Sequence, residues 1–196
     1  MLKTVSYIIL FIVGSTLIGF NEVESKESTV VLSTDSYVKI KGKTNVSTFE
    51  CNFDITTISD GIRIKYNAYD ERIKFNDTKL TLPNLEFNCG GNAINRDFNK
   101  LLNTEEYPEI ILKLKEISKG ESVKNSTSAL IEITLSNKVR TYTVPIVVNN
   151  DEDLNVSGVL PLDINDFGLA APTKMLGMVK VSPDIEIQFS LKILEC

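Results

Sequence analysis

Short runs in which apolar and polar residues alternate dominate the chain. A period of two is typical of β-strands that bury one face. The runs span residues 38–42, 48–54, 62–66, 110–114, 131–135, 142–148, 156–162 and 185–193. Turn signals such as Asp60-Gly61 and Ser136-Asn137 separate several of them. The pattern predicts an all-β domain of about eight strands, and either an antiparallel barrel or a two-sheet sandwich would hide the apolar faces.

The apolar positions of four runs are the candidate interior of such a domain. They are Ile110, Leu112, Leu114, Ile131, Ile133, Leu135, Val144, Ile146, Ile185, Ile187, Phe189 and Leu191. An eight-stranded barrel has an interior that side chains can fill or that can hold one small ligand. These side chains would either line an apolar cavity or pack against one another as a solid core, and the alternation alone does not separate the two.

One segment breaks the β pattern. Ile94, Phe98, Leu101 and Leu102 have the spacing of one helical face, and Tyr107-Pro108 returns the chain to an extended conformation. We expect a short lid helix over one mouth of a barrel. A second irregular stretch, residues 165–180, is expected to cover the other end. Its apolar residues are Phe167, Leu169, Met175, Leu176 and Met178.

The first twenty residues predict a secretory signal peptide, since Lys3 precedes a short apolar run; an uncleaved anchor is the alternative. The mature protein is then expected to be periplasmic or secreted, without stable membrane insertion. Cys51 and Cys89 are placed to form a disulfide in an oxidising compartment. Cys196 is the odd cysteine, and its pairing with either of the others stays open.

Composition narrows the function. The chain has a formal net charge of −5 and no local basic cluster, which disfavours nucleic-acid binding. It contains no histidine, so no Ser-His-Asp triad, His-ligated metal or imidazole base is present. We identify no catalytic residues, no metal site and no cofactor, and expect a non-enzymatic protein.

The order of several motifs resembles the YceI-like family. The stretch IKGKTNVSTFECNF is followed by INRDFNKLLNTEEYPEI, and then by KVRTYTVPIVV, VSGVLPLDINDFGLAAP and DIEIQFSLKI. The resemblance covers residues 28–195 and implies that they form a lipocalin-like, antiparallel eight-stranded barrel with one or two short helices at its ends. It also implies a secreted or periplasmic carrier that holds a polyisoprenoid or other long-chain lipid inside the barrel.

The resemblance also bears on single residues. Arg96 and Asp97 match the family's Arg-Asp pair, so they are candidates for contacting a lipid headgroup or for locking the lid. The family's usual histidine after this pair is missing, and Asn99 follows Phe98 instead. A ligand-free structural or protein-interaction barrel is the alternative function. Ligand length, headgroup and oligomeric state are not predicted.

Overall fold

The computed structural model describes residues 25–119, 127–150, 153–174 and 178–195. Its strands are β1 (Lys26–Leu32), β2 (Tyr37–Thr44), β3 (Thr48–Phe53), β4 (Ile62–Ala68), β5 (Arg72–Pro83), β6 (Phe87–Asn88), β7 (Glu109–Lys119), β8 (Thr127–Leu135), β9 (Lys138–Asn149), β10 (Leu154–Asp163), β11 (Thr173–Lys174) and β12 (Val179–Glu195). Its helices are α1 (Asn92–Leu101) and the short 3₁₀ helices η1 (Ile55–Thr57), η2 (Asn84–Glu86) and η3 (Ile164–Phe167). No helix in these ranges is long and apolar enough to cross a bilayer. The predicted signal peptide, Met175, Leu176 and Cys196 lie outside the described residues.

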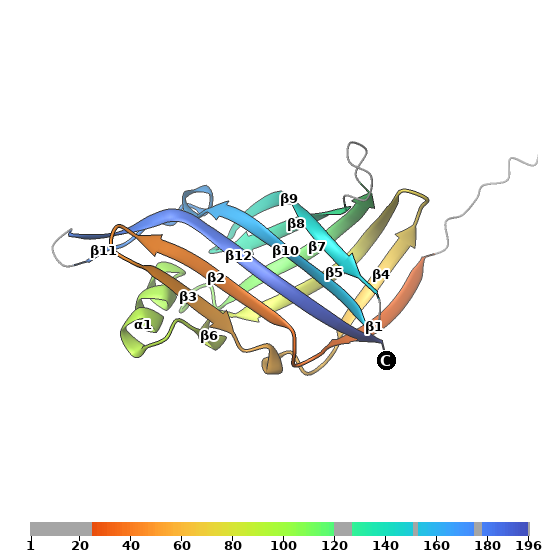
Figure 1. Cartoon of the computed structure of the whole chain (residues 1–196), viewed down its shortest axis with the longest axis horizontal. Coiled ribbons are helices and arrows are strands. Elements are labelled where there is room, and N and C mark those ends of the chain that lie inside the picture. The colour runs from red at the N-terminus through yellow and green to blue at the C-terminus, as the bar shows by residue number, and fades with distance from the viewer. Residues whose placement is uncertain (1–24, 120–126, 151–152, 175–177, 196) are drawn as a thin grey trace, which may run out of the picture.

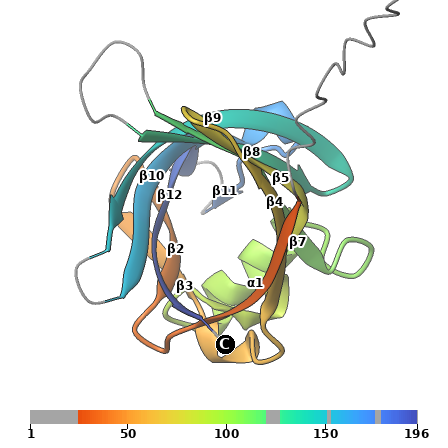
Figure 2. The same cartoon turned by 90° about the vertical axis from the view of Figure 1, so that its right-hand side faces the viewer.

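Eight antiparallel strands close into a ring (Figures 1 and 2). Their order is β1-β4-β5-β7-β8-β9-β10-β12, and pairing of β1 with β12 closes it. β12 has 17 residues, so one edge pairs with β10 while the other pairs first with β2 and then with β1. β2, β3 and β6 continue the sheet beyond the ring. The predicted all-β, eight-stranded antiparallel barrel is confirmed, and the sandwich is excluded.

The strands that form the ring are not all those predicted from sequence. β2 and β3 were expected in the barrel and instead extend the sheet outside it, whereas β1 and β5 belong to the ring and were missed. β5 was missed because its apolar residues do not keep a single period-two pattern along the strand. Its pairing with β7 jumps from Lys74 to Thr78, a β-bulge that moves the apolar positions from odd to even numbers.

Both helical covers lie at one end of the barrel, which corrects the expectation that they cover opposite ends. α1 precedes β7 and η3 follows β10, and an even number of antiparallel strands lies between them. Each antiparallel strand reverses the chain, so both connections return to the same end. We call this the packed end. The mouth end lies opposite, where the β4–β5 hairpin turns, β7 and β9 end, and β8 and β10 begin (Figure 1).

The packed end is filled by side chains. Leu82 and Phe87 are each 2% exposed, and the Phe87 ring lies 5.3 Å from that of Phe98 on α1. Phe167 of η3 is also 2% exposed and stacks on Tyr142, whose pKa is raised by burial and by Asp166. α1 and η3 therefore plug this end with one continuous apolar core.

Cys51 and Cys89 form a disulfide, as the sequence predicted. Cys51 lies on β3 and is fully buried, while Cys89 follows β6 directly. β3 and β6 share only two residue pairs, Asn52 with Asn88 and Phe53 with Phe87. The covalent bond thus holds the segment that leads into α1 against the sheet.

Candidate functional site

The mouth half of the barrel contains a cavity of about 450 Å³. This volume lies within the range of about 300–1,000 Å³ that is usual for pockets that bind small molecules. The strands of the ring supply almost all of its lining, with Val38 of β2 added. No residue of α1, η3, β3 or β6 is among the lining residues, because those elements belong to the packed end or extend beyond the ring. The interior is therefore solid at one end and hollow at the other.

Eight of the twelve predicted interior residues line this cavity. They are Leu112, Leu114, Ile131, Ile133, Ile146, Ile187, Phe189 and Leu191. The remaining four also face the interior but lie toward the packed end. Ile110, Leu135 and Val144 are buried in its core, and the partly buried Ile185 packs against that core. That the lining residues contact lipid stays a prediction.

Sequence reasoning missed other parts of the wall. The missed lining residues with aliphatic or aromatic side chains are Val30, Leu32, Val38, Ile62, Ile64, Tyr66, Ile73, Phe75, Leu80, Ile117, Ala129, Val148, Leu154, Val156, Leu160 and Ile193. Most of them lie in or beside the alternating runs described above, so the period-two pattern could have identified them as interior residues. Those of β5 lie on both sides of its bulge, and Ile117 follows a register shift near Glu116 of β7.

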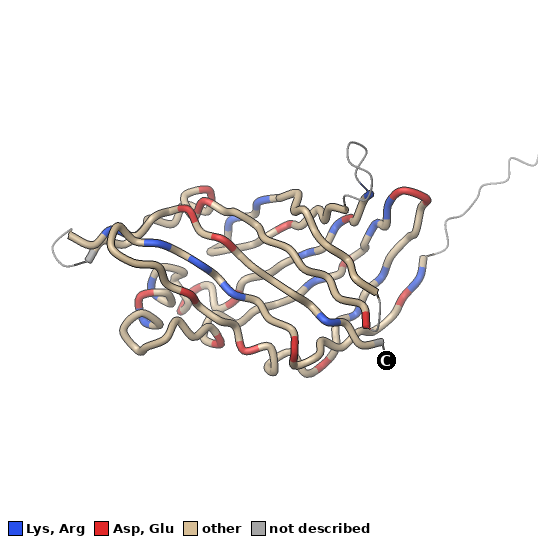
Figure 3. The backbone as a smooth tube through the Cα atoms, in the orientation of Figure 1, with Lys and Arg blue, Asp and Glu red and all other residues tan. Residues whose placement is uncertain are grey.

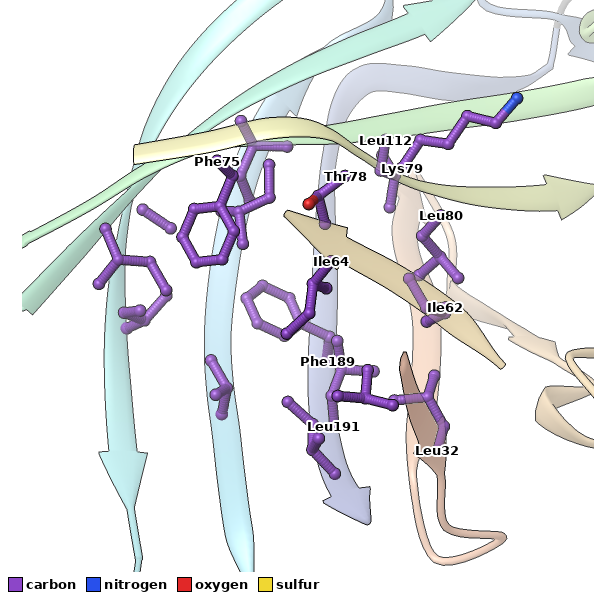
Figure 4. Close-up of a pocket in the computed structure, with 18 of the residues that line it drawn as sticks. Leu32, Ile62, Ile64, Phe75, Thr78, Lys79, Leu80, Leu112, Phe189 and Leu191 are labelled. Carbon is purple, nitrogen blue, oxygen red and sulfur yellow. The ribbon is translucent and has the colours of Figure 1, made fainter. Parts of the chain in front are cut away.

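The cavity wall is almost entirely apolar (Figure 4). Only Tyr66, Thr78 and Lys79 among the lining residues carry polar side-chain atoms. Figure 4 shows the Lys79 amino group directed away from the other labelled side chains, whereas Thr78 lies among them. Such a wall favours a ligand that is mostly hydrocarbon, because each buried methylene contributes about 0.8 kcal/mol.

Phe189 takes its place in the wall because the neighbouring strand carries a glycine. Gly158 of β10 pairs with Phe189, and a Cβ at position 158 would lie 2.7 Å from the ring and 3.0 Å from the Pro145 carbonyl oxygen. No side chain other than hydrogen fits there without moving the ring. Gly158 therefore sets the position of the largest side chain that β12 contributes to the cavity.

The residues predicted for a lid lie at the packed end. Ile94, Phe98 and Leu101 pack partly buried against the core, and Leu102 is 4% exposed just after α1. The helix prediction is confirmed, but this helix lies opposite the mouth and covers none of the cavity.

Arg96 and Asp97 are on the same helix, and neither lines the cavity. Arg96 is exposed and Asp97 half-buried. A headgroup contact at the mouth gains no support from this placement, and a role in locking α1 stays a prediction.

Asn99 stands where the family's usual histidine was expected, and it also lies away from the cavity. Its side-chain oxygen accepts a hydrogen bond from Thr104 Oγ1 at 3.0 Å, and Thr104 Oγ1 in turn accepts one from the buried Asn84 side chain at 3.1 Å. Asn99 therefore braces the segment after α1 against η2. The missing histidine does not alter the cavity lining.

Charged residues lie on the outer surface of the strands. Figure 3 shows both signs as bands separated by uncharged positions. Glu50 of β3 contacts Lys39 and Lys41 of β2 at 3.1 and 3.7 Å, and the Lys39 hydrogen bond lowers the Glu50 pKa. A second hollow of about 630 Å³ lies beside these residues, and its lining includes Lys41, Glu50 and Asp184. Its mixed charges make it a poor match for hydrocarbon.

Comparisons with known proteins agree with this architecture. The model of the YceI-like domain matches residues 22–193. A solved polyisoprenoid-binding domain from Saccharophagus degradans has a TM-score of 0.59 at 13% identity, covering 86% of this chain and 99% of its own. BcnA from Burkholderia cenocepacia has a TM-score of 0.56 at 20% identity, covering 81% of this chain and 96% of its own. A search of curated proteins found no match.

The two structural likenesses fall below 25% identity, so they establish the fold alone. The family match extends over nearly all of the described residues and includes every strand of the closed ring. The barrel, its order of strands and the matched range together place the chain in the YceI-like family.

Proposed function

We propose that this protein is a non-enzymatic carrier or sequestering protein that holds one long-chain apolar lipid, of the polyisoprenoid class, in the mouth half of its barrel. The observation that carries the proposal is the apolar cavity of about 450 Å³ inside a barrel whose other half is filled. A ligand-free structural barrel needs no such hollow, because unfilled space forfeits packing contacts.

Family membership supports the same ligand class. The domain from Saccharophagus degradans, which shares this fold, is described as polyisoprenoid-binding. The many methyl branches of an isoprenoid chain suit a wall built from isoleucine, leucine and valine. We further propose a periplasmic or secreted location, for which the Cys51–Cys89 disulfide is the structural support.

Direct binding tests the proposal. After co-purified lipid has been removed by unfolding, solvent extraction and refolding, the protein should bind N-phenyl-1-naphthylamine, a neutral dye that fluoresces in apolar surroundings, and farnesol should displace it with a stoichiometry of one per chain. A dye that stays dark, or dye fluorescence that farnesol leaves unchanged, would contradict an accessible lipid site. The protein unfolded in guanidinium chloride serves as a control for non-specific dye binding.

A further inference from the structure

Thr78 is a polar residue buried in an apolar wall. It lies on β5, lines the cavity and is 7% exposed. On β5 it stands between Phe75 on the mouth side and Leu80 on the packed side, and both of these also line the cavity (Figure 4). Thr78 pairs across the sheet with Leu114, another lining residue. The other lining residues around Thr78 are thus almost all apolar.

A β-bulge places Thr78 there. The β5–β7 register shifts between Lys74 and Thr78, and Asp77 within the bulge has a φ of 59°. If the alternation set by Ile73 and Phe75 continued unchanged, Asp77 and Lys79 would face the cavity. The bulge changes the phase, so Asp77 is not a lining residue, the Lys79 amino group is directed away from the other labelled side chains, and Thr78 and Leu80 turn inward (Figure 4).

The Thr78 hydroxyl is left with an unused proton. Its oxygen accepts a hydrogen bond from the Lys65 backbone N–H at 3.4 Å, close to where the β4–β5 ladder stops at Tyr66. Within the described residues this is the hydroxyl's single hydrogen bond, and in it the hydroxyl acts as the acceptor, so its proton is not donated. Burying a hydroxyl donor without a partner costs about 1–3 kcal/mol.

We propose that Thr78 donates a hydrogen bond to a neutral oxygen of the bound lipid, and so selects chains that carry a hydroxyl or carbonyl oxygen inside the barrel. This inference rests on the proposed function. Lys79 is the one cationic residue among the described lining residues, and its amino group is directed away from the other labelled side chains, so an ionised phosphate beside Thr78 would be buried without a counter-charge (Figure 4). The ligand oxygen that accepts the hydrogen bond from Thr78 is therefore uncharged.

The test compares two ligands and two substitutions. Farnesol and farnesene share a fifteen-carbon isoprenoid chain, but farnesene lacks the hydroxyl. Displacement of N-phenyl-1-naphthylamine gives the affinity of each for the wild-type protein, Thr78→Val and Thr78→Ser. Thr78→Val keeps the side-chain shape and should lower the ratio of farnesol to farnesene affinity about tenfold. Thr78→Ser keeps the hydroxyl and should retain the wild-type ratio.

Three outcomes would overturn the inference while leaving lipid binding intact. Thr78→Val could leave both affinities unchanged, or it could weaken both ligands equally, which would mean that Thr78 only supports the wall. Tyr66→Phe could remove the preference instead, which would assign it to the other uncharged polar residue of the lining. A wild-type protein that binds neither ligand would refute the proposed function itself. Thermal unfolding of each variant verifies that it is folded.

Discussion

Ala129→Phe should weaken farnesol binding by more than 100-fold. Ala129 is 3% exposed, lies on β8 and lines the cavity, so a phenyl ring at this position projects into the hollow. A ring there displaces about four carbons of ligand, each contributing about 0.8 kcal/mol, and the sum of about 3 kcal/mol corresponds to the stated loss. Dye displacement measures the affinity, and chemical denaturation measures the stability of the filled barrel.

Leu130→Phe is the matched control. Leu130 is the next residue on β8, but it is 37% exposed and does not line the cavity. The same aromatic group at that position should leave farnesol affinity within about twofold, because it adds bulk only outside the barrel. Equal losses in both variants, or an unchanged affinity in a folded Ala129→Phe protein, would contradict ligand binding in this cavity.

Removal of the Cys51–Cys89 disulfide should lower the free energy of unfolding by about 4 kcal/mol, given its sequence separation of 38 residues. The reason is that the bond restricts the unfolded chain, so its removal lets the segment between the two cysteines gain conformational freedom in the unfolded state. Guanidinium unfolding of Cys51→Ala/Cys89→Ala, compared with the oxidised parent, measures the difference.

Both proteins in that comparison should carry Cys196→Ser, which prevents thiol exchange with the third cysteine. Treating the parent with a reductant should reproduce the shift, and the same reductant should leave the double alanine variant unchanged. If the unfolding midpoints of oxidised and reduced parent coincide, the disulfide contributes no stability and its proposed role in holding the α1 segment is wrong.

Alternation predicted most of the barrel because each ring strand has one face in the interior. On β8, for example, Ala129 and Ile133 are nearly inaccessible while Leu130 points outward. The same reasoning failed on β5, since a bulge shifts the phase within one strand and leaves two short half-patterns around Asp77. The residue with the most distinctive chemistry in the wall, Thr78, lies just after that bulge. A period-two pattern therefore cannot show that Thr78 faces the cavity.

Sequence also could not separate the hollow half from the packed half. Leu112 and Val144 have the same chemical character and both face inward, yet one lines the cavity and the other is fully buried. The difference arises because α1 and η3 fill one end together. Counting the antiparallel strands between them would have placed both at that end, but only the assembled ring shows that no helix of the described residues covers the other.

The central claim is that the hollow half of the barrel carries lipid, and extraction of the protein tests it most directly. Wild type and Ala129→Phe are expressed in parallel, purified without detergent, unfolded and extracted with organic solvent for mass spectrometry. We expect a long-chain apolar lipid from the wild-type protein, close to one molecule per chain, and a strongly reduced amount from the variant. A wild-type extract with no long-chain lipid above the level of the variant would contradict the account.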